Sequence, residues 1–112
     1  MDKTKRVSNC CFNTLCETWR NLSDKDFLDY LVKSNFFCYI IFQREYSERK
    51  GEHWQGYLEL KRQRYLTQII RLVKGFVEER KRSQEEAIDY CKKENTKIGP
   101  TYEWGNKKNL VG

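Results

Sequence analysis

Hydrophobic and polar residues follow one another along the chain in a way that predicts both strands and helices. Four runs are rich in aromatic and β-branched residues and are expected to be strands: 8–15, 36–45, 53–60 and 75–81. The second run is apolar at odd and even positions, which indicates an interior strand covered on both faces. A polar loop at 46–52 predicts a hairpin between the second and third runs. Residues 101–105 follow the only proline, Pro100, and are expected to add an edge strand.

Three other segments have the period of amphipathic helices and are expected to be helical: 23–34, 64–73 and 83–94. Ser23 can cap the first helix, and Ser83 with Glu86 forms the sequence pattern of a capping box at the third. The order of elements predicts an α+β fold of the ferredoxin-like (RRM-like) split βαβ type with an extra C-terminal helix. We expect an antiparallel sheet of about five strands with the helices packed on one face.

Length and composition predict a single domain over residues 1–112. This length leaves no room for a second core, and 38% hydrophobic residues can fill one. No apolar run approaches the roughly 20 residues that cross a bilayer, and the first residues lack the apolar region of a secretory signal. A soluble intracellular domain that does not bind membranes is therefore expected.

The net charge of +6 is concentrated in residues 61–82. This segment has two acidic residues, Glu78 and Glu79, and eight basic ones: Lys61, Arg62, Arg64, Arg71, Lys74, Arg80, Lys81 and Arg82. Such a basic segment is typical of proteins that bind nucleic acid, although a solvated helix face rich in lysine has the same pattern.

The five cysteines include no C-x-x-C pair, and the chain has one histidine, so a zinc site of ordinary spacing is not expected. We expect five reduced thiols, of which Cys38 and Cys91 pack as small hydrophobic side chains.

Polar side chains gather on one face of the strand expected at 53–60. Because side chains alternate between the faces of a strand, four residues share this face: His53, Gln55, Tyr57 and Glu59. Glu45 ends the preceding strand and is expected to lie close to His53. Imidazole nitrogen, amide oxygen and carboxylate oxygen could converge on one ion, and this set suits Mg²⁺ or Mn²⁺. The spacing leaves open the alternative that His53 and Glu45 are ordinary residues at the end of a hairpin.

Tyr90 and Lys93 lie three residues apart in the last predicted helix and are expected to project from the same side. A tyrosine hydroxyl, with an ordinary pKa of about 10, is a weak nucleophile that a nearby cation activates by favouring the phenolate. A tyrosine packed on the sheet beside a solvated lysine would give the same pattern.

In this order, the motifs resemble those of the replication initiators of circoviruses, nanoviruses and geminiviruses, which have circular single-stranded DNA. These are HUH endonucleases, where U is a bulky hydrophobic residue. "HWQGYLEL" matches their second motif in its His-x-Gln form, and "YCKKE" matches their third, Tyr-x-x-Lys. "CCFNTL" is similar to their first motif, usually Phe-Thr-Leu, with Asn13 inserted before Thr14. "IGPTYEWGN" resembles the end of the domain, so the likeness covers nearly the whole chain.

The resemblance implies roles for particular residues. His53, Gln55 and Glu45 would be the ligands of Mn²⁺ or Mg²⁺, Tyr90 the nucleophile, and Lys93 a residue that places the phosphate or the tyrosine. Since Gln55 stands where the wider superfamily has a second histidine, metal affinity is expected to be weaker. The residues expected to contact DNA are Phe12, Asn13, Thr14, Tyr57, Arg62 and Arg64. Tyr57 or Trp104 could stack on bases, with a structural role as the alternative for Tyr57.

The implied activity is nicking and rejoining of a viral origin of rolling-circle replication. Tyr90 would form a 5′-phosphotyrosine and release a 3′-hydroxyl, within a nonanucleotide in the loop of a DNA hairpin. The resemblance also implies a location in the host nucleus and an isolated domain that is monomeric, within an oligomeric full-length initiator. The chain has no G-x-x-x-x-G-K-[ST] loop, so it is not itself the ATP-driven helicase that accompanies the domain in full-length initiators. The resemblance implies that a helicase domain follows it in a longer protein, and a naturally short protein is the alternative.

Two other classes of protein fit parts of the sequence. A non-catalytic RNA-binding module of RRM type shares the order of elements, but "HWQGYLEL" does not fit an RNP1 run and Tyr90 and Lys93 would have no role. A purely structural interaction domain explains neither the basic segment nor the polar set.

Overall fold

The computed structural model describes residues 4–109 and confirms the expected order of strands and helices. The elements are β1 (Arg6–Leu15), the 3₁₀ helix η1 (Cys16–Trp19), α1 (Asp24–Lys33), β2 (Phe37–Ser47), β3 (Gly51–Tyr65), α2 (Leu66–Val73), β4 (Phe76–Glu79), α3 (Gln84–Tyr90) and β5 (Lys97–Gly105). The strands form one antiparallel sheet in the order β4-β1-β3-β2-β5. Because β3 lies between β1 and β2, the sheet has the split βαβ arrangement of ferredoxin-like folds.

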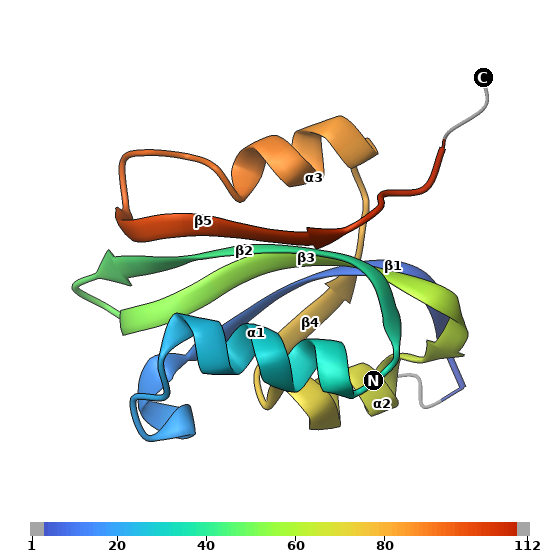
Figure 1. Ribbon diagram of the computed structural model, residues 1–112, viewed down its shortest axis with the longest axis horizontal. Helices are drawn as coiled ribbons and strands as arrows, with labels where there is room; N and C mark the ends of the chain where they lie inside the picture. Colours follow the sequence, from blue (N-terminus) through green and yellow to red (C-terminus); the bar gives the residue numbers. More distant parts are fainter. Residues whose placement is uncertain (1–3, 110–112) are drawn as a thin grey trace.

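The expectation that all helices pack on one face is wrong. Helices α1 and α2 cover one face of the sheet, and α3 lies on the other (Figure 1). The sequence shows why the second face needs a cover, since three large apolar side chains meet there: Tyr39, Ile41 and Tyr57. Ala87, Ile88 and Cys91 of α3 pack on them and form a second, smaller core.

Several elements differ in length from the expected ones. Strand β3 continues to Tyr65, because its backbone stays paired with β1 past an irregularity between Val7 and Asn9, whatever the charge of its side chains. Strand β5 begins at Lys97 and includes Pro100, which an edge strand tolerates. Helix α3 ends at Tyr90, four residues earlier than expected.

The larger core, on the face of the sheet covered by α1 and α2, holds the two strands of the β2–β3 hairpin in place. The rings of Phe27 in α1 and Trp54 in β3 stack with centroids 4.0 Å apart. Trp54 Nε1 and Arg44 Nε each donate to Asp24 Oδ1 at 2.8 Å, and Asp24 opens α1 directly after its cap, Ser23. An anionic side chain in the first turn also interacts favourably with the helix dipole. These contacts hold Arg44 and Trp54, the neighbours in sequence of Glu45 and His53.

All five cysteines are free thiols, as expected, and Cys10, Cys16 and Cys91 are buried. Within residues 4–109, no helix has the length and apolar character needed to cross a membrane.

Candidate active site

The β2–β3 hairpin brings Glu45 and His53 together. The two residues are direct partners in the ladder, and Glu45 Oε1 lies 3.6 Å from His53 Nε2. His53 Nδ1 lies 3.1 Å from the carbonyl oxygen of Gly51. Since a carbonyl only accepts hydrogen bonds, Nδ1 carries the proton and a neutral ring keeps a lone pair on Nε2. The nitrogen that faces Glu45 is therefore the one able to bind a metal.

Glu45 is 1% exposed and remains an anion. Burial alone would raise the pKa of its carboxyl, but the hydrogen bond that Gln43 donates and the charge of Lys93 hold that pKa below its ordinary value. Lys93 Nζ lies 3.5 Å from Glu45 Oε1. The carboxylate is thus charged at neutral pH and available as a hard oxygen ligand.

Gln43 is a buried residue of the site that the sequence did not reveal. Its Nε2 donates to Glu45 Oε2 at 2.9 Å and to the backbone oxygen of Lys93 at 2.7 Å. Its Oε1 accepts from Thr101 Oγ1 in β5 at 3.0 Å. One amide therefore joins Glu45, the turn after α3 and the edge strand. A signal was present, because Gln43 is a polar residue two positions from Glu45 in an otherwise apolar run.

Gln55 is the third candidate metal ligand, beside Glu45 and His53. It lies two residues after His53 on the same face of β3, with Gln43 as its partner in β2 and Asn13 in β1. Within residues 4–109, no residue forms a hydrogen bond with the Gln55 side-chain amide, so the amide oxygen is available. The same part of the chain contains no cluster of three His, Cys, Asp or Glu. The Gln55 amide is the candidate for a third ligand beside Glu45 and His53. Imidazole, carboxylate and amide ligands of this kind fit Mn²⁺ or Mg²⁺.

Tyr90 stands above this set at the end of α3. The capping box of Ser83 and Glu86 starts the helix, and Ile88 and Cys91 bury its inner side. The Tyr90 side chain remains 53% exposed. Although the helix ends before Lys93, the lysine still reaches the tyrosine, with Nζ 4.0 Å from the ring centroid.

The environment keeps Lys93 positively charged. Partial burial lowers the pKa of its ammonium group, but the hydrogen bond with Tyr90 and the charge of Glu45 outweigh burial and hold the pKa above its ordinary value. A cation is thus placed between the carboxylate of the candidate metal site and the aromatic hydroxyl.

Two clefts meet at Tyr90. The smaller, of about 280 Å³, contains the candidate ligands and is lined by Glu45, Ser47, Arg49, Lys50, His53, Gln55, Tyr90, Lys93 and Thr96. The larger, of about 410 Å³, lies toward β1 and β4 and shares Lys50, Gln55 and Tyr90 with the first. Asn13, the exposed ring of Phe76 and the basic run 80–82 also line it.

Three of the residues expected to contact DNA are buried, so those expectations are wrong. Phe12 and Thr14 point into the larger core, where Thr14 Oγ1 donates to the Lys74 carbonyl at 3.1 Å. Tyr57 is fully covered by α3 and cannot stack on a base. Trp104 is half-buried against the core. Asn13 of the first motif lines the larger cleft together with Cys11, because both alternate with Phe12 and Thr14 along β1.

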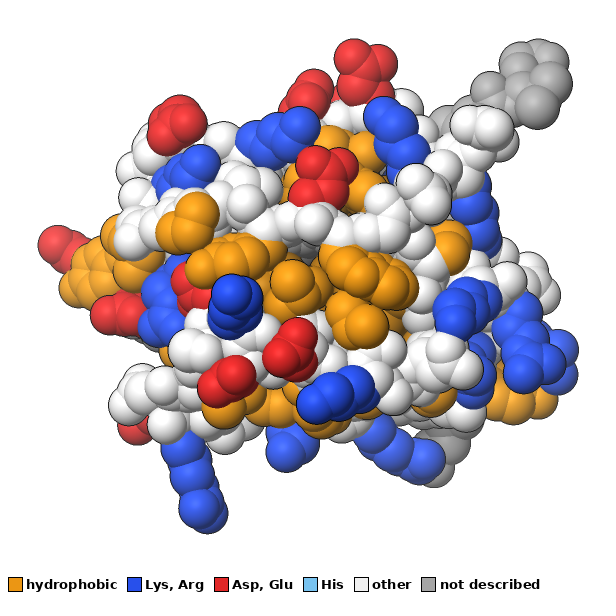
Figure 2. Space-filling view, viewed as in Figure 1, with side chains coloured by type: hydrophobic (Ala, Val, Ile, Leu, Met, Phe, Trp, Pro, Cys, Tyr) orange, Lys and Arg blue, Asp and Glu red, His pale blue; other side chains and the backbone are white. Residues whose placement is uncertain are grey.

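Arg62 and Arg64 do not line either cleft. Arg62 is nine residues from His53 on the same strand, a separation of up to about 30 Å at about 3.3 Å per residue. Arg64 is half-buried, with its guanidinium 3.7 Å from the centroid of the Phe36 ring. Basic side chains gather at the end of the molecule where β3 runs into α2 (Figure 2). The basic segment of the sequence is therefore divided between this end and the larger cleft.

A split βαβ sheet with imidazole, carboxylate and amide donors on its inner strands, under a helix that ends in an exposed tyrosine, corresponds to the HUH class of domain. Comparison with known proteins agrees. The model of the family described as "Putative viral replication protein" matches residues 10–94. The chain belongs to this family, and the resemblance to the replication initiators of circular single-stranded DNA viruses is confirmed.

Individual relatives are replication proteins of plant nanoviruses. The chain is 42% identical over 71 residues to the master replication protein of banana bunchy top virus, a match that covers 62% of this chain and 25% of the relative. It is 34% identical over 74 residues to the master replication protein of subterranean clover stunt virus, a match that covers 65% of this chain and 26% of the relative. The chain thus spans about a quarter of the length of these curated relatives.

Proposed function

We propose that this domain nicks and rejoins single-stranded DNA at the origin of a circular single-stranded DNA virus, and so initiates rolling-circle replication. The observation that carries the proposal is the meeting of Tyr90, Lys93 and the Glu45–His53–Gln55 set at one cleft. The family of the chain and the names of its relatives support a role in replication.

Tyr90 would supply the nucleophile. Its hydroxyl oxygen attacks the phosphorus of a phosphodiester in line, so that the new bond to phosphorus forms as the bond to the 3′-oxygen breaks. The phenolic proton is lost and the 3′-oxygen takes up a proton, which leaves a 5′-phosphotyrosine and a 3′-hydroxyl. Attack by a 3′-hydroxyl on the phosphotyrosine reverses the step and joins two ends without another energy source.

Charge at the cleft favours this reaction. A divalent ion held by Glu45, His53 and Gln55 would polarise the phosphate and offset the negative charge that builds on its oxygens. Lys93, positive and beside the Tyr90 ring, favours the phenolate and attracts the phosphate. Gln43 orients Glu45 through a hydrogen bond. On the other face of the sheet, Asp24 accepts hydrogen bonds from Arg44 of β2 and Trp54 of β3.

The larger cleft would guide the strand to Tyr90. Its basic residues, Arg80, Lys81 and Arg82, can contact phosphates, and Phe76 offers a ring for stacking. Because the cut phosphate must pass between α3 and the sheet, the substrate has to be single-stranded there. The hairpin origin, the host nucleus and a helicase domain in a longer initiator belong to the same proposal.

The test is formation of a covalent complex between protein and DNA. Fluorescent single-stranded oligonucleotides that carry origin loops from a panel of circular DNA viruses are mixed with the protein and Mn²⁺, and denaturing gels are read for a slower band. We expect the band with the wild type, its loss with a chelator, and its absence in Tyr90→Phe.

Tyr46→Phe is the matched control, because Tyr46 is 50% exposed and lines neither cleft. It should form the band as the wild type does. Salt-sensitive binding of the whole panel without any covalent band would contradict the proposal and favour the alternative, a non-catalytic module that binds single-stranded nucleic acid.

A further inference from the structure

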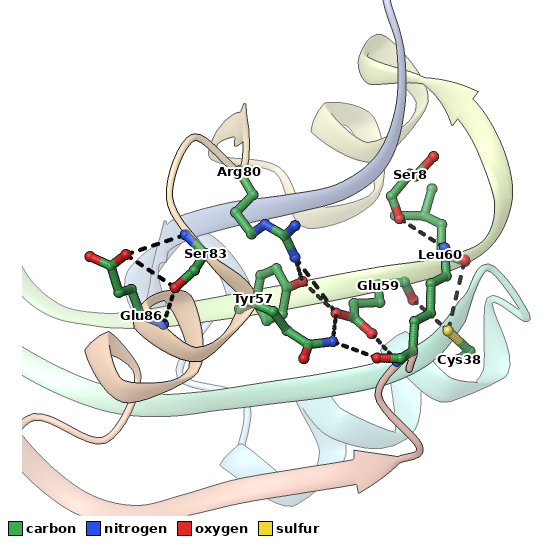
Figure 3. A network of polar contacts seen from close by, with 10 residues as sticks. Ser8, Cys38, Tyr57, Glu59, Leu60, Arg80, Ser83 and Glu86 are labelled. Carbon is green, nitrogen blue, oxygen red and sulfur yellow. Dashed lines mark hydrogen bonds and ion pairs between the residues drawn. The ribbon is translucent and has the colours of Figure 1, made fainter. Parts of the chain in front are cut away.

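Glu59 is a buried carboxylate for which the proposed reaction has no use. It lies on the same face of β3 as His53 and is 1% exposed. A buried carboxylate costs several kcal/mol unless its oxygens receive hydrogen bonds. Three donors meet the requirement (Figure 3): Tyr57 Oη at 2.5 Å, Gln84 Nε2 at 2.8 Å and the backbone N–H of Lys108 at 2.6 Å. Arg80 Nη1 lies 3.9 Å away and forms an ion pair with it.

Apart from Tyr57 on the same strand, these partners come from α3, from the segment before it and from the chain after β5. Gln84 is the first residue of α3, and Arg80 belongs to the segment between β4 and α3. Arg80 also donates to Tyr57 Oη at 2.7 Å, and Gln84 Nε2 donates to the Lys108 carbonyl at 2.9 Å. Glu59 is thus the common acceptor of a network that joins the sheet, the start of α3 and the chain after β5.

The chain after β5 is directed to Glu59 by a glycine. Gly105 has φ of +82°, and a Cβ there would lie 2.1 Å from the Cys38 carbonyl oxygen. Only glycine fits both the left-handed backbone and the close approach. The next residue, Asn106, donates to the same carbonyl at 2.9 Å. Residues 106–108 then cross from β2 to Glu59 on β3, and Lys108 Nζ reaches the Ser8 carbonyl on β1 at 3.5 Å.

The network lies at the opposite end of α3 from Tyr90. Gln84 and Tyr90 are the first and last residues of a seven-residue helix, about 9 Å apart at about 1.5 Å per residue. A helix this short is not stable in isolation, so its contacts decide its position. Packing of Ile88 and Cys91 prevents it from leaving the sheet, but apolar contacts are not directional. The hydrogen bonds at Gln84 provide the direction at the start of the helix.

We propose that Glu59 is a positioning residue for Tyr90. By holding Gln84, Arg80 and the backbone of Lys108, it fixes the first turn of α3 and hence the direction from which Tyr90 enters the cleft. The inference rests on the proposed function of Tyr90. An error of about 1 Å in the position of a reacting group can cost about a hundredfold in rate, so a distant anchor of the helix can control the reaction.

Two substitutions and one control test this role. Glu59→Gln keeps the shape but turns an NH₂ group toward three donors, so at least one of them loses its acceptor. Lys108→Pro removes one backbone N–H and leaves the Glu59 side chain in place. Glu103→Gln is the matched control, since Glu103 Oε2 accepts from Tyr39 Oη at 2.5 Å on the same face of the sheet and has no bond to α3.

The first measurement is amide hydrogen exchange of residues 84–91 without DNA, on variants whose circular dichroism shows a folded domain. Glu59→Gln should exchange at least about tenfold faster there, Lys108→Pro should change in the same direction, and Glu103→Gln should match the wild type. The second is the single-turnover rate of covalent complex formation at saturating oligonucleotide and Mn²⁺. The rate should fall at least about tenfold in Glu59→Gln, while the Kd values for oligonucleotide and Mn²⁺ change less than about threefold.

A merely structural role would lower the melting temperature and leave the rate of the folded fraction unchanged. Unchanged exchange in α3, or a folded Glu59→Gln that reacts at the wild-type rate, overturns the inference. A wild type that forms no covalent complex overturns the proposed reaction instead. In that case the exchange data alone decide whether Glu59 anchors α3.

Discussion

Glu45 and His53 are opposite each other in the β2–β3 hairpin, with Oε1 and Nε2 3.6 Å apart. The register of the hairpin creates this pair, because a slip of one residue would turn His53 to the other face of the sheet. On the opposite face of the sheet, the stack of Phe27 on Trp54 opposes such a slip. The hydrogen bonds from Arg44 and Trp54 to Asp24 oppose it as well. The site is therefore formed by the fold before any ligand binds.

Gln55→His should strengthen metal binding, because an imidazole is a stronger ligand for divalent transition metals than a neutral amide. We expect the Kd for Mn²⁺, measured by calorimetry, to fall by roughly tenfold, about 1.4 kcal/mol. His53→Ala should abolish measurable binding. Gln63→His on the exposed distal part of β3 is the control and should leave the Kd unchanged. Equal affinities of the wild type and Gln55→His would show that residue 55 is not a ligand.

Gly56→Ala should destabilise the domain. A Cβ at this position would lie 2.3 Å from the Phe12 ring and 2.8 Å from the Ile41 carbonyl, in the middle of the sheet. Overpacking of this kind costs about 1–3 kcal/mol. Urea unfolding should show the loss, and Phe12→Leu should recover part of it in the double variant, since the ring is the closest obstacle. Additive effects of the two substitutions would mean that the backbone moves instead.

The sequence predicted the candidate site better than its surroundings. Alternation along one strand placed His53 and Gln55 together, and a hairpin was enough to add Glu45. The role of Gln43 depends on its contacts with Thr101 and with the Lys93 carbonyl, and pairing between strands distant in sequence is not visible in a local pattern. Alternation placed Glu59 on the polar face, but its network was missed for the same reason, since Lys108 lies far along the chain.

The wrong expectations share one cause, which is that periodicity shows which residues share a face but not what covers that face. Tyr57 was expected to be exposed because His53, Gln55 and Glu59 are polar, yet α3 lies over it. The sequence predicted the helix that became α3, but not the face of the sheet on which it packs. The clustering of basic residues in the sequence likewise could not show that Arg62 and the run 80–82 lie in different places. They are apart because β3 extends to Tyr65 before the chain turns back.

The thiols should differ in reactivity in the order of their exposure. Burial raises the pKa of the Cys16 thiol to about 11 and raises those of Cys10 and Cys91 above their ordinary value. Since the thiolate is the reactive form, these three should resist iodoacetamide at neutral pH. Burial also raises the pKa of the Cys11 thiol, but Cys11 and Cys38 are only half-buried, so the reagent can reach their sulfur atoms and they should react first. Mass spectrometry of peptides after timed alkylation measures the order. Early labelling of Cys91 would indicate that α3 opens readily.

The domain should lose stability in alkali. Burial, followed by the hydrogen bond to Glu59, raises the pKa of Tyr57 above its ordinary value of about 10, and burial with Glu103 does the same for Tyr39. A group whose pKa is raised by folding contributes fully below its unfolded pKa, and the contribution is lost as pH rises above it. Unfolding free energies should therefore decline above about pH 10. Near-ultraviolet absorbance should show these tyrosines ionising only with unfolding, and their early titration in the folded protein would contradict this.

Arg82→Ala should weaken binding of a short single-stranded oligonucleotide more than Arg62→Ala does. Both side chains are exposed, but Arg82 lines the cleft at Tyr90 and Arg62 lies at the far end of β3. Loss of one phosphate contact should reduce the slope of log K against log salt by about 0.7 for a single strand. Fluorescence anisotropy at several salt concentrations measures both slopes. Arg82 pairs with Glu86 at 3.8 Å in solvent, a contact worth less than about 1 kcal/mol, so folding should change little. A larger effect of Arg62→Ala would move the DNA path to the far end of β3, where the sequence had first placed it.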